Sequence, residues 1–297
     1  MISDVATGIL RERHGVSGPV TTHETWNGST VIEIDELIMK VNDHPSAAAE
    51  QRVVDRVRSA GVPAPEIIDT GTDSRFPGRR WIIMRRVPGT SWDASAADDA
   101  EVGTVLADVA QLLLIMRELT CPGYGWIDPD GNGRSADWWK WLQDQITDRT
   151  HQLGGRLPPG FGPAATETID RIAATPVNGS ILHGDLGLSH VFVDPHTHRV
   201  IGLIDWSNAV IGDPLYDLAT FAMGGPAGDP IQQRLQPRLQ QIYTDQLGPG
   251  AVDERRLGLY RMLHHLNNAC WSVENHVDDW TVDLCTAAAD QLHALQF

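Results

Sequence analysis

Lysine and cysteine are scarce in this chain of 297 residues. Of its 23 basic residues only Lys40 and Lys140 are lysines, and the others are arginines. No Gly-Lys-Ser or Gly-Lys-Thr sequence occurs, which excludes the P-loop as a way of binding phosphates. The three cysteines form neither a Cys-x-x-Cys unit nor a paired framework, and this usage is typical of a reduced cytoplasm.

Long hydrophobic runs are also missing. The longest, residues 112–116, is far too short to cross a bilayer, and residues 1–15 lack the apolar core of a signal peptide. The formal net charge of −16 argues against nonspecific binding to nucleic acid or to an anionic membrane. An acidic surface suits a cationic partner, but it also simply keeps a protein in solution. We therefore expect a cytoplasmic monomer or homodimer that binds neither nucleic acid nor membranes.

The order of the expected elements indicates an α+β fold with two lobes, the first built on an antiparallel sheet and the second mainly helical. Asn27-Gly28 is a strong hairpin signal between two strands, and Val87-Pro88-Gly89 ends the run of strands. The predicted lobes are therefore residues 1–87 and 88–297. The predicted strands are residues 20–26, 29–34, 37–41, 66–69 and 81–86, and the predicted helices are residues 4–14, 47–60, 102–116, 135–150, 164–174, 214–224, 230–247, 252–276 and 279–295.

The chemistry of the chain is concentrated between residues 183 and 217. A His-Gly-Asp loop that ends at Asp185 leads into a short apolar strand, residues 191–193. A polar turn and a second apolar strand follow, and that strand ends on Asp205. Two strands around one loop should bring Asp185, His190 and Asp205 toward a single point. One catalytic carboxylate and two metal ligands in this arrangement suit the transfer of a phosphoryl group to a hydroxyl.

This stretch resembles the catalytic core of the aminoglycoside and macrolide phosphotransferases, small-molecule kinases with a protein-kinase-like fold. The resemblance implies that Asp185 is the catalytic aspartate and Asp205 a magnesium ligand. His190 stands where the family usually has Asn, a replacement shared with the macrolide and 2″-aminoglycoside kinases. A neutral imidazole nitrogen can bind a divalent metal, although magnesium prefers oxygen. The implied cofactor is Mg²⁺, with ATP or GTP as the phosphate donor.

The same family holds its nucleotide with a lysine on the third strand and a glutamate on the next helix. Lys40 lies on the third predicted strand, and Glu50 follows ten residues later in the next helix. Met84, Arg85 and Val87 occupy the position of the hinge that binds the purine, and they do not distinguish adenine from guanine. Residues 26–30 stand where the family has a nucleotide-covering loop, although a plain hairpin turn explains them equally well.

Tryptophans and acids near the C-terminus suggest where the acceptor binds. The family resemblance places Trp138, Trp139, Trp141, Trp271 and Trp280 in regions that line the acceptor cleft. Tryptophans at helical spacing are, however, more often part of a core. Glu274 and Asp278, with the neighbouring Asp279 and Asp283, could meet ammonium groups of an acceptor or could be a solvated helix end.

The leading functional hypothesis is an O-phosphotransferase that uses a nucleoside triphosphate to modify a hydroxyl of an antibiotic-like small molecule and so confers resistance. The acceptor would be a macrolide, an aminoglycoside or a nucleoside antibiotic. A kinase for homoserine, choline or a hexosamine is the nearest alternative, because acceptor pockets diverge while the nucleotide machinery persists. A silent nucleotide-binding protein should have lost Lys40, Asp185 or Asp205, and all three are present. A metallohydrolase would need a third ligand beside His196 and His198.

Overall fold

The computed structural model describes residues 2–23, 29–42, 47–173 and 176–296. The N-terminal part is a five-stranded antiparallel sheet in the order β1-β2-β3-β5-β4. Its strands are β1 (Val20–His23), β2 (Thr30–Ile34), β3 (Leu37–Asn42), β4 (Ile67–Thr72) and β5 (Arg80–Arg85). All five predicted strands are therefore present. The predicted Asn27-Gly28 turn and most of the nucleotide-covering loop lie outside the described residues.

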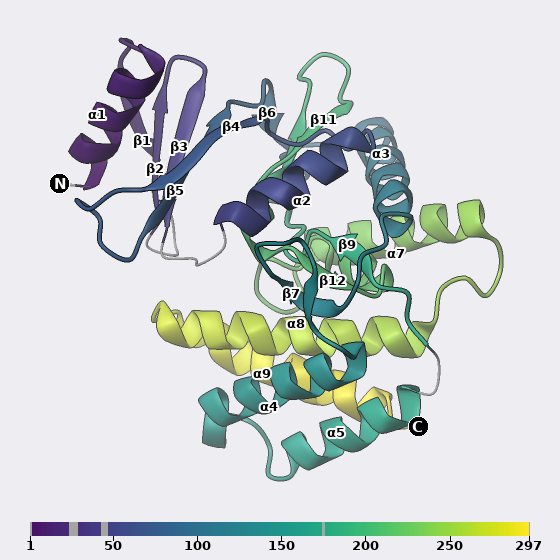
Figure 1. Ribbon diagram of the computed structural model, residues 1–297. Helices are drawn as coiled ribbons and strands as arrows, with labels where there is room; N and C mark the ends of the chain where they lie inside the picture. Colours follow the sequence, from purple (N-terminus) through teal and green to yellow (C-terminus); the bar gives the residue numbers. More distant parts are fainter. Residues whose placement is uncertain (1, 24–28, 43–46, 174–175, 297) are drawn as a thin grey trace.

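The two faces of this sheet have different roles. Helix α1 (Ile2–His14) covers one face, where Ile32, Met39 and Ile83 pack in a closed apolar cluster (Figure 1). Successive side chains of a strand point to opposite faces, so Lys40 points away from α1. Lys40 is paired with Val31 on β2 and with Ile82 on β5, in the middle of the sheet. The alternation thus directs the lysine toward the second half of the molecule.

Helix α2 (Ala47–Ser59) joins the sheet to the second half of the chain. Its Val53, Val54 and Val57 are almost fully buried in the large apolar core that also includes most C-terminal helices. After β5 the chain leaves the sheet, and β6 (Thr90–Ser91) pairs with β10 (Val191–Val193). The segment after the predicted hinge is therefore anchored directly beside the His-Gly-Asp loop.

The C-terminal part contains helices around two small sheets, with the orders β11-β10-β6 and β8-β7-β12-β9. Figure 1 shows α4, α5, α8 and α9 grouped on the side away from the N-terminal sheet. The four-stranded sheet was not predicted, because strands of three or four residues are too short to show a period. The helices are α3 (Asp99–Arg117), α4 (Trp138–Leu153), α5 (Phe161–Ile172), α6 (Leu215–Thr220), α7 (Pro230–Leu247), α8 (Glu254–Glu274) and α9 (Asp278–Ala294), and the remaining strands are β7 (Tyr124–Ile127), β8 (Gly133–Ser135), β9 (Ser180–Leu182), β11 (Val200–Leu203) and β12 (Val210–Gly212).

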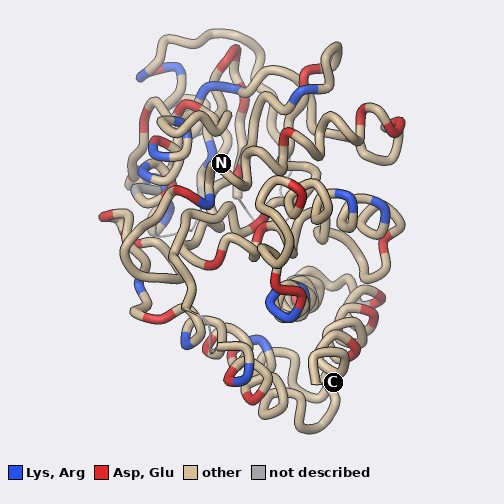
Figure 2. Tube along the Cα trace, turned by 90° about the vertical axis from the view of Figure 1, so that its right-hand side faces the viewer, with Lys and Arg blue, Asp and Glu red and all other residues tan. Residues whose placement is uncertain are grey.

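Charge is distributed over the whole chain. Acidic and basic residues are interspersed along the trace rather than collecting on separate halves of the molecule (Figure 2). Within the described residues, no helix combines the length and the apolar character that a membrane crossing requires.

Candidate active site

The predicted nucleotide, metal and catalytic residues lie around one cleft of about 590 Å³. Strands β3 and β5 form one wall, and the loops beside β10 and β11 form the other. Residues separated by more than 160 positions in the chain therefore meet across it. Its lining includes every residue predicted for these roles, namely Lys40, Glu50, Met84, Arg85, Val87, Asp185, His190 and Asp205.

Lys40 and Asp205 form an ion pair across the cleft. Nζ of Lys40 lies 2.5 Å from Oδ1 of Asp205 and 3.3 Å from Oγ of Ser207. Burial acts to lower the pKa of Lys40, but the charges of Glu50 and Asp205 outweigh it and raise that pKa. Burial acts to raise the pKa of Asp205, yet Lys40 and His190 hold it well below its usual range. Both groups are therefore charged at neutral pH.

Glu50 of α2 lines the same cleft without forming an ion pair with Lys40. Among the described residues, Asp205 is the carboxylate within 4.0 Å of the Lys40 ammonium. Burial raises the pKa of Glu50 to about 6, and the charge of Lys40 opposes this rise. Glu50 thus acts on Lys40 through its charge, while Asp205 takes the ion-pair position beside Nζ.

The His-Gly-Asp loop is shaped by its neighbours. Gly184 has φ +79°, and a Cβ at this position would lie 2.0 Å from the carbonyl oxygen of Asn208. Only glycine fits such a close approach in this conformation. The Asn208 amide also donates from Nδ2 to Oδ2 of Asp185 at 3.1 Å. Asn208 therefore fixes both the path of the loop and the orientation of the catalytic candidate.

His190 is held in a defined orientation by the same loop. Its Nδ1 lies 2.7 Å from the backbone carbonyl oxygen of Asp185, and a carbonyl can only accept a hydrogen bond. The proton of the neutral ring is therefore on Nδ1, which leaves the lone pair of Nε2 available. This is the tautomer that a metal-binding imidazole needs.

Asp217 of α6 holds the backbone of the His-Gly-Asp loop through its carboxylate. Its carboxylate accepts hydrogen bonds from the backbone N–H groups of His183 at 2.6 Å and Gly184 at 2.9 Å. The side chain is fully buried, and burial raises the pKa of Asp217 to about 6. These contacts give Asp217 a structural role in the loop.

We expect Asp217→Asn to lower the free energy of unfolding by about 2 kcal/mol, because the new amide nitrogen would face one of two buried N–H donors. Urea denaturation would measure the change. The matched control is Asp194→Asn, since Asp194 accepts the same kind of backbone hydrogen bonds from His196 and Thr197 in an exposed turn. If the two variants lost equal stability, Asp217 would not be a special support of the loop.

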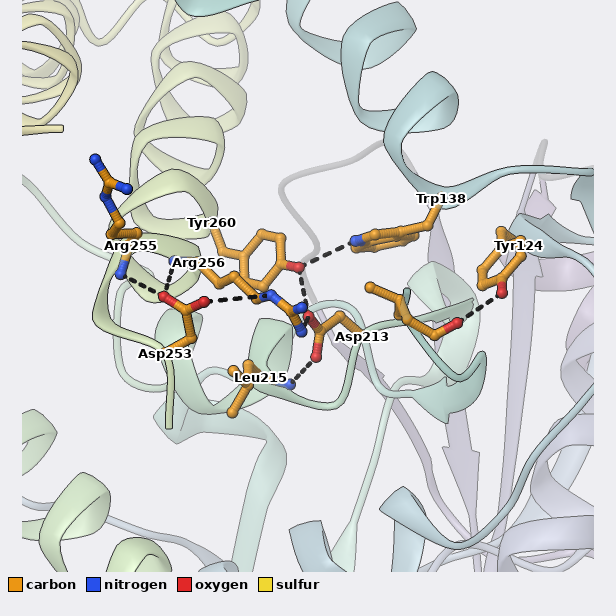
Figure 3. Close-up of polar contacts among 9 residues, drawn as sticks. Tyr124, Trp138, Asp213, Leu215, Asp253, Arg255, Arg256 and Tyr260 are labelled. Carbon is orange, nitrogen blue, oxygen red and sulfur yellow. Dashed lines mark hydrogen bonds and ion pairs between the residues drawn. The ribbon is translucent and has the colours of Figure 1, made fainter. Parts of the chain in front are cut away.

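Asp213 connects the end of β12 to helices α4 and α8 (Figure 3). Its Oδ2 accepts from the Tyr260 hydroxyl at 2.7 Å and from Arg256 at 3.1 Å, while Oδ1 accepts from the Leu215 N–H at 3.0 Å. Trp138 donates from Nε1 to the Tyr260 hydroxyl at 3.0 Å. Trp138 therefore belongs to a buried structural network rather than to the acceptor cleft.

A second cavity of about 400 Å³ adjoins the cleft. Four residues line both spaces, namely Asp185, Asn208, Asn268 and Trp271. Asp185 can thus be reached from both sides, which is the geometry that a transfer between two bound molecules requires. The other lining residues of this second cavity are Trp126, Trp141, Gln145, Arg149, Gln152, Gly184, Val210, Tyr216, Leu263, His264, Asn267, Cys270 and Glu274.

The structure places only some of the predicted acceptor residues in the walls of the two spaces. Trp271 lines both spaces, and Glu274 lines the second cavity, where its Oε1 accepts from Gln152 at 2.7 Å. Trp141 is in the cavity wall and Trp280 in the nucleotide cleft. Trp139 is buried with Arg256 over its ring, so the core alternative applies to it. The side chain of Asp278 lies outside the described part of the structure.

Several residues of the site were not predicted. Asn208 follows Asp205 by three positions, and Asn267 and Asn268 lie in the middle of a helix with no local motif. Arg149 likewise reads as one more polar residue on a helix. In the sequence, only the Asp205-Trp206-Ser207-Asn208 run after a buried strand could have indicated that Asn208 belongs to the site. The rest could be found only once α4 and α8 were placed against the loop.

The two histidines of the β10–β11 turn do not form a metal site. Asp194 accepts hydrogen bonds from the turn backbone, and His198 lies 3.3 Å from Glu101. Over the described ranges, no group of three His, Cys, Asp or Glu side chains is arranged to hold a metal ion. The metallohydrolase alternative therefore gains no support.

Comparison with known proteins gives consistent results. Hygromycin-B 4-O-kinase of Escherichia coli is 24% identical over 261 residues, which cover 84% of this chain and 73% of that protein. An aminoglycoside 3'-phosphotransferase of Streptomyces ribosidificus is 23% identical over 206 residues, covering 68% of this chain and 74% of that protein. A solved structure of aminoglycoside phosphotransferase APH(4)-Ia, in a ternary complex with AMP-PNP and hygromycin B, has the same fold with a TM-score of 0.77, 20% identity and 98% coverage of both chains. Residues 13–259 match the phosphotransferase enzyme family, and the chain belongs to that family.

Proposed function

We propose that this protein is a magnesium-dependent O-phosphotransferase that moves the γ-phosphate of ATP or GTP to a hydroxyl of an antibiotic-like small molecule. In this proposal residues 1–87 form the nucleotide-binding lobe and residues 88–297 the catalytic and acceptor-binding lobe. The observation that carries it is the position of Asp185, which lines both the 590 Å³ cleft and the adjoining 400 Å³ cavity.

The cleft has the charges that a triphosphate needs. The buried ammonium of Lys40 would bind phosphate oxygens, and Glu50 would keep it charged and in place. A triphosphate would compete with Asp205 for Lys40, since Asp205 is its ion-pair partner. Met84 and the backbone of residues 85–87 would contact the base, because they line the far end of the same cleft.

Asp205 and His190 would hold Mg²⁺. The donor set fits this ion because Asp205 is an ionised carboxylate and Nε2 of His190 carries a lone pair. When bound, Mg²⁺ would neutralise charge on the phosphate oxygens. Two protein ligands are sufficient, because magnesium in kinases takes its remaining ligands from phosphates and water.

Asp185 would orient the acceptor hydroxyl and accept its proton. Asn208 engages Oδ2 of this carboxylate at 3.1 Å, which leaves Oδ1 to meet the hydroxyl. The neighbouring Trp126, Trp141 and Trp271 would give the acceptor apolar surface. The antibiotic class is supported by the relatives, whose names describe kinases of hygromycin B and of aminoglycosides.

The proposal is tested by measuring nucleotide turnover with a panel of acceptors, using ATP and GTP in parallel. We expect phosphorylation of at least one aminoglycoside, macrolide or nucleoside antibiotic. Mass spectrometry would show a single added phosphoryl group, and the Asp185→Asn protein would serve as the blank. If homoserine, choline or a hexosamine were phosphorylated while every antibiotic stayed unmodified, the antibiotic assignment would be wrong.

A further inference from the structure

The second cavity is lined by charges of both signs. Its lining contains three charged side chains, and these are Arg149, Asp185 and Glu274. Asp185 is reserved for the reacting hydroxyl in the proposed function, on which this inference rests. Arg149 and Glu274 are therefore the charged side chains that would recognise the rest of the acceptor.

The carboxylate of Glu274 is already engaged in a hydrogen bond at the cavity. It is the last residue of α8, its side chain is exposed, and its Oε1 accepts a hydrogen bond from Nε2 of Gln152 at 2.7 Å. An exposed carboxylate at a cavity mouth attracts a cation only weakly, because water and salt screen it. Glu274 alone therefore provides little selectivity for an amino group.

Arg149 is more closely integrated into the cavity. Its side chain is half-buried, and Nε donates to Oδ1 of Asn267 at 2.9 Å. Asn267 and Tyr216 line the same cavity as Arg149 and Asp185. The hydrogen bond to Asn267 therefore fixes the guanidinium in the wall that also contains the catalytic candidate.

Among the described residues, the guanidinium of Arg149 hydrogen-bonds to Asn267 and has no Asp or Glu oxygen within 4.0 Å. A half-buried guanidinium held by one hydrogen bond keeps its terminal nitrogens for a planar, two-oxygen anion. A cationic acceptor would instead meet an uncompensated like charge at this point.

We propose that the acceptor is a hydroxylated monoanion, with a carboxylate that pairs with Arg149 and an aromatic or sugar body that lies against Trp126 and Trp271. A carboxylate fits this position because its two oxygens match two parallel N–H donors of one guanidinium. The cavity of about 400 Å³ is large enough for one ring system with its substituents. On this inference a carboxylate-bearing member of the proposed antibiotic classes is a better acceptor than a polycationic aminoglycoside.

Three matched probes test the charge preference, namely phenyl glucuronide, phenyl glucoside and phenyl glucosaminide. They share a ring system and carry a negative, a neutral and a positive charge. Quenching of tryptophan fluorescence reports binding without any turnover, since three tryptophans line the cavity. With a non-hydrolysable ATP analogue present, we expect the glucuronide to bind about tenfold more tightly than the glucoside, and the glucosaminide to bind least.

Arg149→Gln should abolish the preference for the glucuronide, and Arg149→Lys should keep part of it. Arg156→Gln is the matched control, because Arg156 is exposed and does not line the cavity. Thermal melting would establish that each variant is folded. Glu274→Gln should leave the order of the three probes unchanged.

The outcomes separate this inference from the proposed function. Equal affinities, no measurable glucuronide binding, or tighter glucosaminide binding would overturn the inference even if phosphoryl transfer to some antibiotic were found. A glucuronide preference that depends on Arg149, combined with no transfer to any acceptor, would support the inference and contradict the kinase assignment.

Discussion

Asp185→Asn is expected to reduce phosphoryl transfer roughly a thousandfold or more while nucleotide binding is retained. The amide cannot accept the proton of the acceptor hydroxyl. Its oxygen can still accept the hydrogen bond that Asn208 donates to Oδ2, so the loop should keep its shape. Single-turnover transfer and nucleotide titration would be measured on the same preparation.

The control for Asp185→Asn is Asp290→Asn, the same chemical change at an exposed position of α9. It should leave both transfer and nucleotide binding unchanged. Near-normal transfer by the Asp185 variant would remove this residue from the mechanism. Loss of nucleotide binding together with transfer would instead mean that Asp185 supports the phosphate site rather than the acceptor.

Asp205→Ala should abolish metal-dependent nucleotide binding. The change removes the carboxylate expected to hold Mg²⁺ and leaves the buried Lys40 without its ion-pair partner. Because the backbone of Asp205 has φ +63°, Asp205→Asn is the companion variant, since asparagine tolerates this left-handed conformation better than alanine. Calorimetric titration of ATP and GTP, with and without Mg²⁺, would measure the effect.

His190→Asn provides the comparison at the same metal site. It should keep substantial activity, because Asn is the commoner residue here in the family that the motif resembles and offers the oxygen that magnesium prefers. If His190→Asn lost metal-dependent binding as completely as Asp205→Ala, the site would depend on the imidazole itself. If Asp205→Asn bound nucleotide normally with Mg²⁺, the metal assignment of Asp205 would be wrong.

Most of the nucleotide side could be predicted from short patterns. The His-Gly-Asp loop, the strand that ends on Asp205, and Lys40 on the third strand are local features, and each is where the structure has it. Gly184 shows why such a motif is informative, because its backbone contact with Asn208 leaves no room for a side chain. The geometry of a loop of this kind is a property of neighbouring residues, so a short pattern can indicate it.

The electrostatic partners within the site were harder to predict from the sequence. The sequence predicted Glu50 as the partner of Lys40, and Glu50 does raise the pKa of Lys40, but the ion pair is with Asp205, which is 165 positions away. Spacing along a helix indicates which side chains share a face, but it does not measure the distance across a cleft. The nearest opposite charge is set by how the two lobes are placed against each other.

The acceptor side of the site was also only partly predictable from the sequence. Tryptophan spacing on α4 was compatible with both a core and a cleft, and the structure places Trp138 and Trp141 in the core, with Trp141 also lining the cavity. Trp138 is turned toward α8, where it donates a hydrogen bond to Tyr260. Arg149 and Asn267 carried no local signal at all.

The sequence by itself determined the two-part α+β order, the sheet and its lysine strand, and the chemistry of residues 183–217, because these depend on periodicity and on contacts between chain neighbours. Only the tertiary structure decided that Asp185 lies between two cavities, that Asn208 holds it, and that Arg149 lines the acceptor side. These features come from the packing of α4 and α8 against the loop. Such packing depends on side-chain fit between distant segments, which no single stretch of sequence contains.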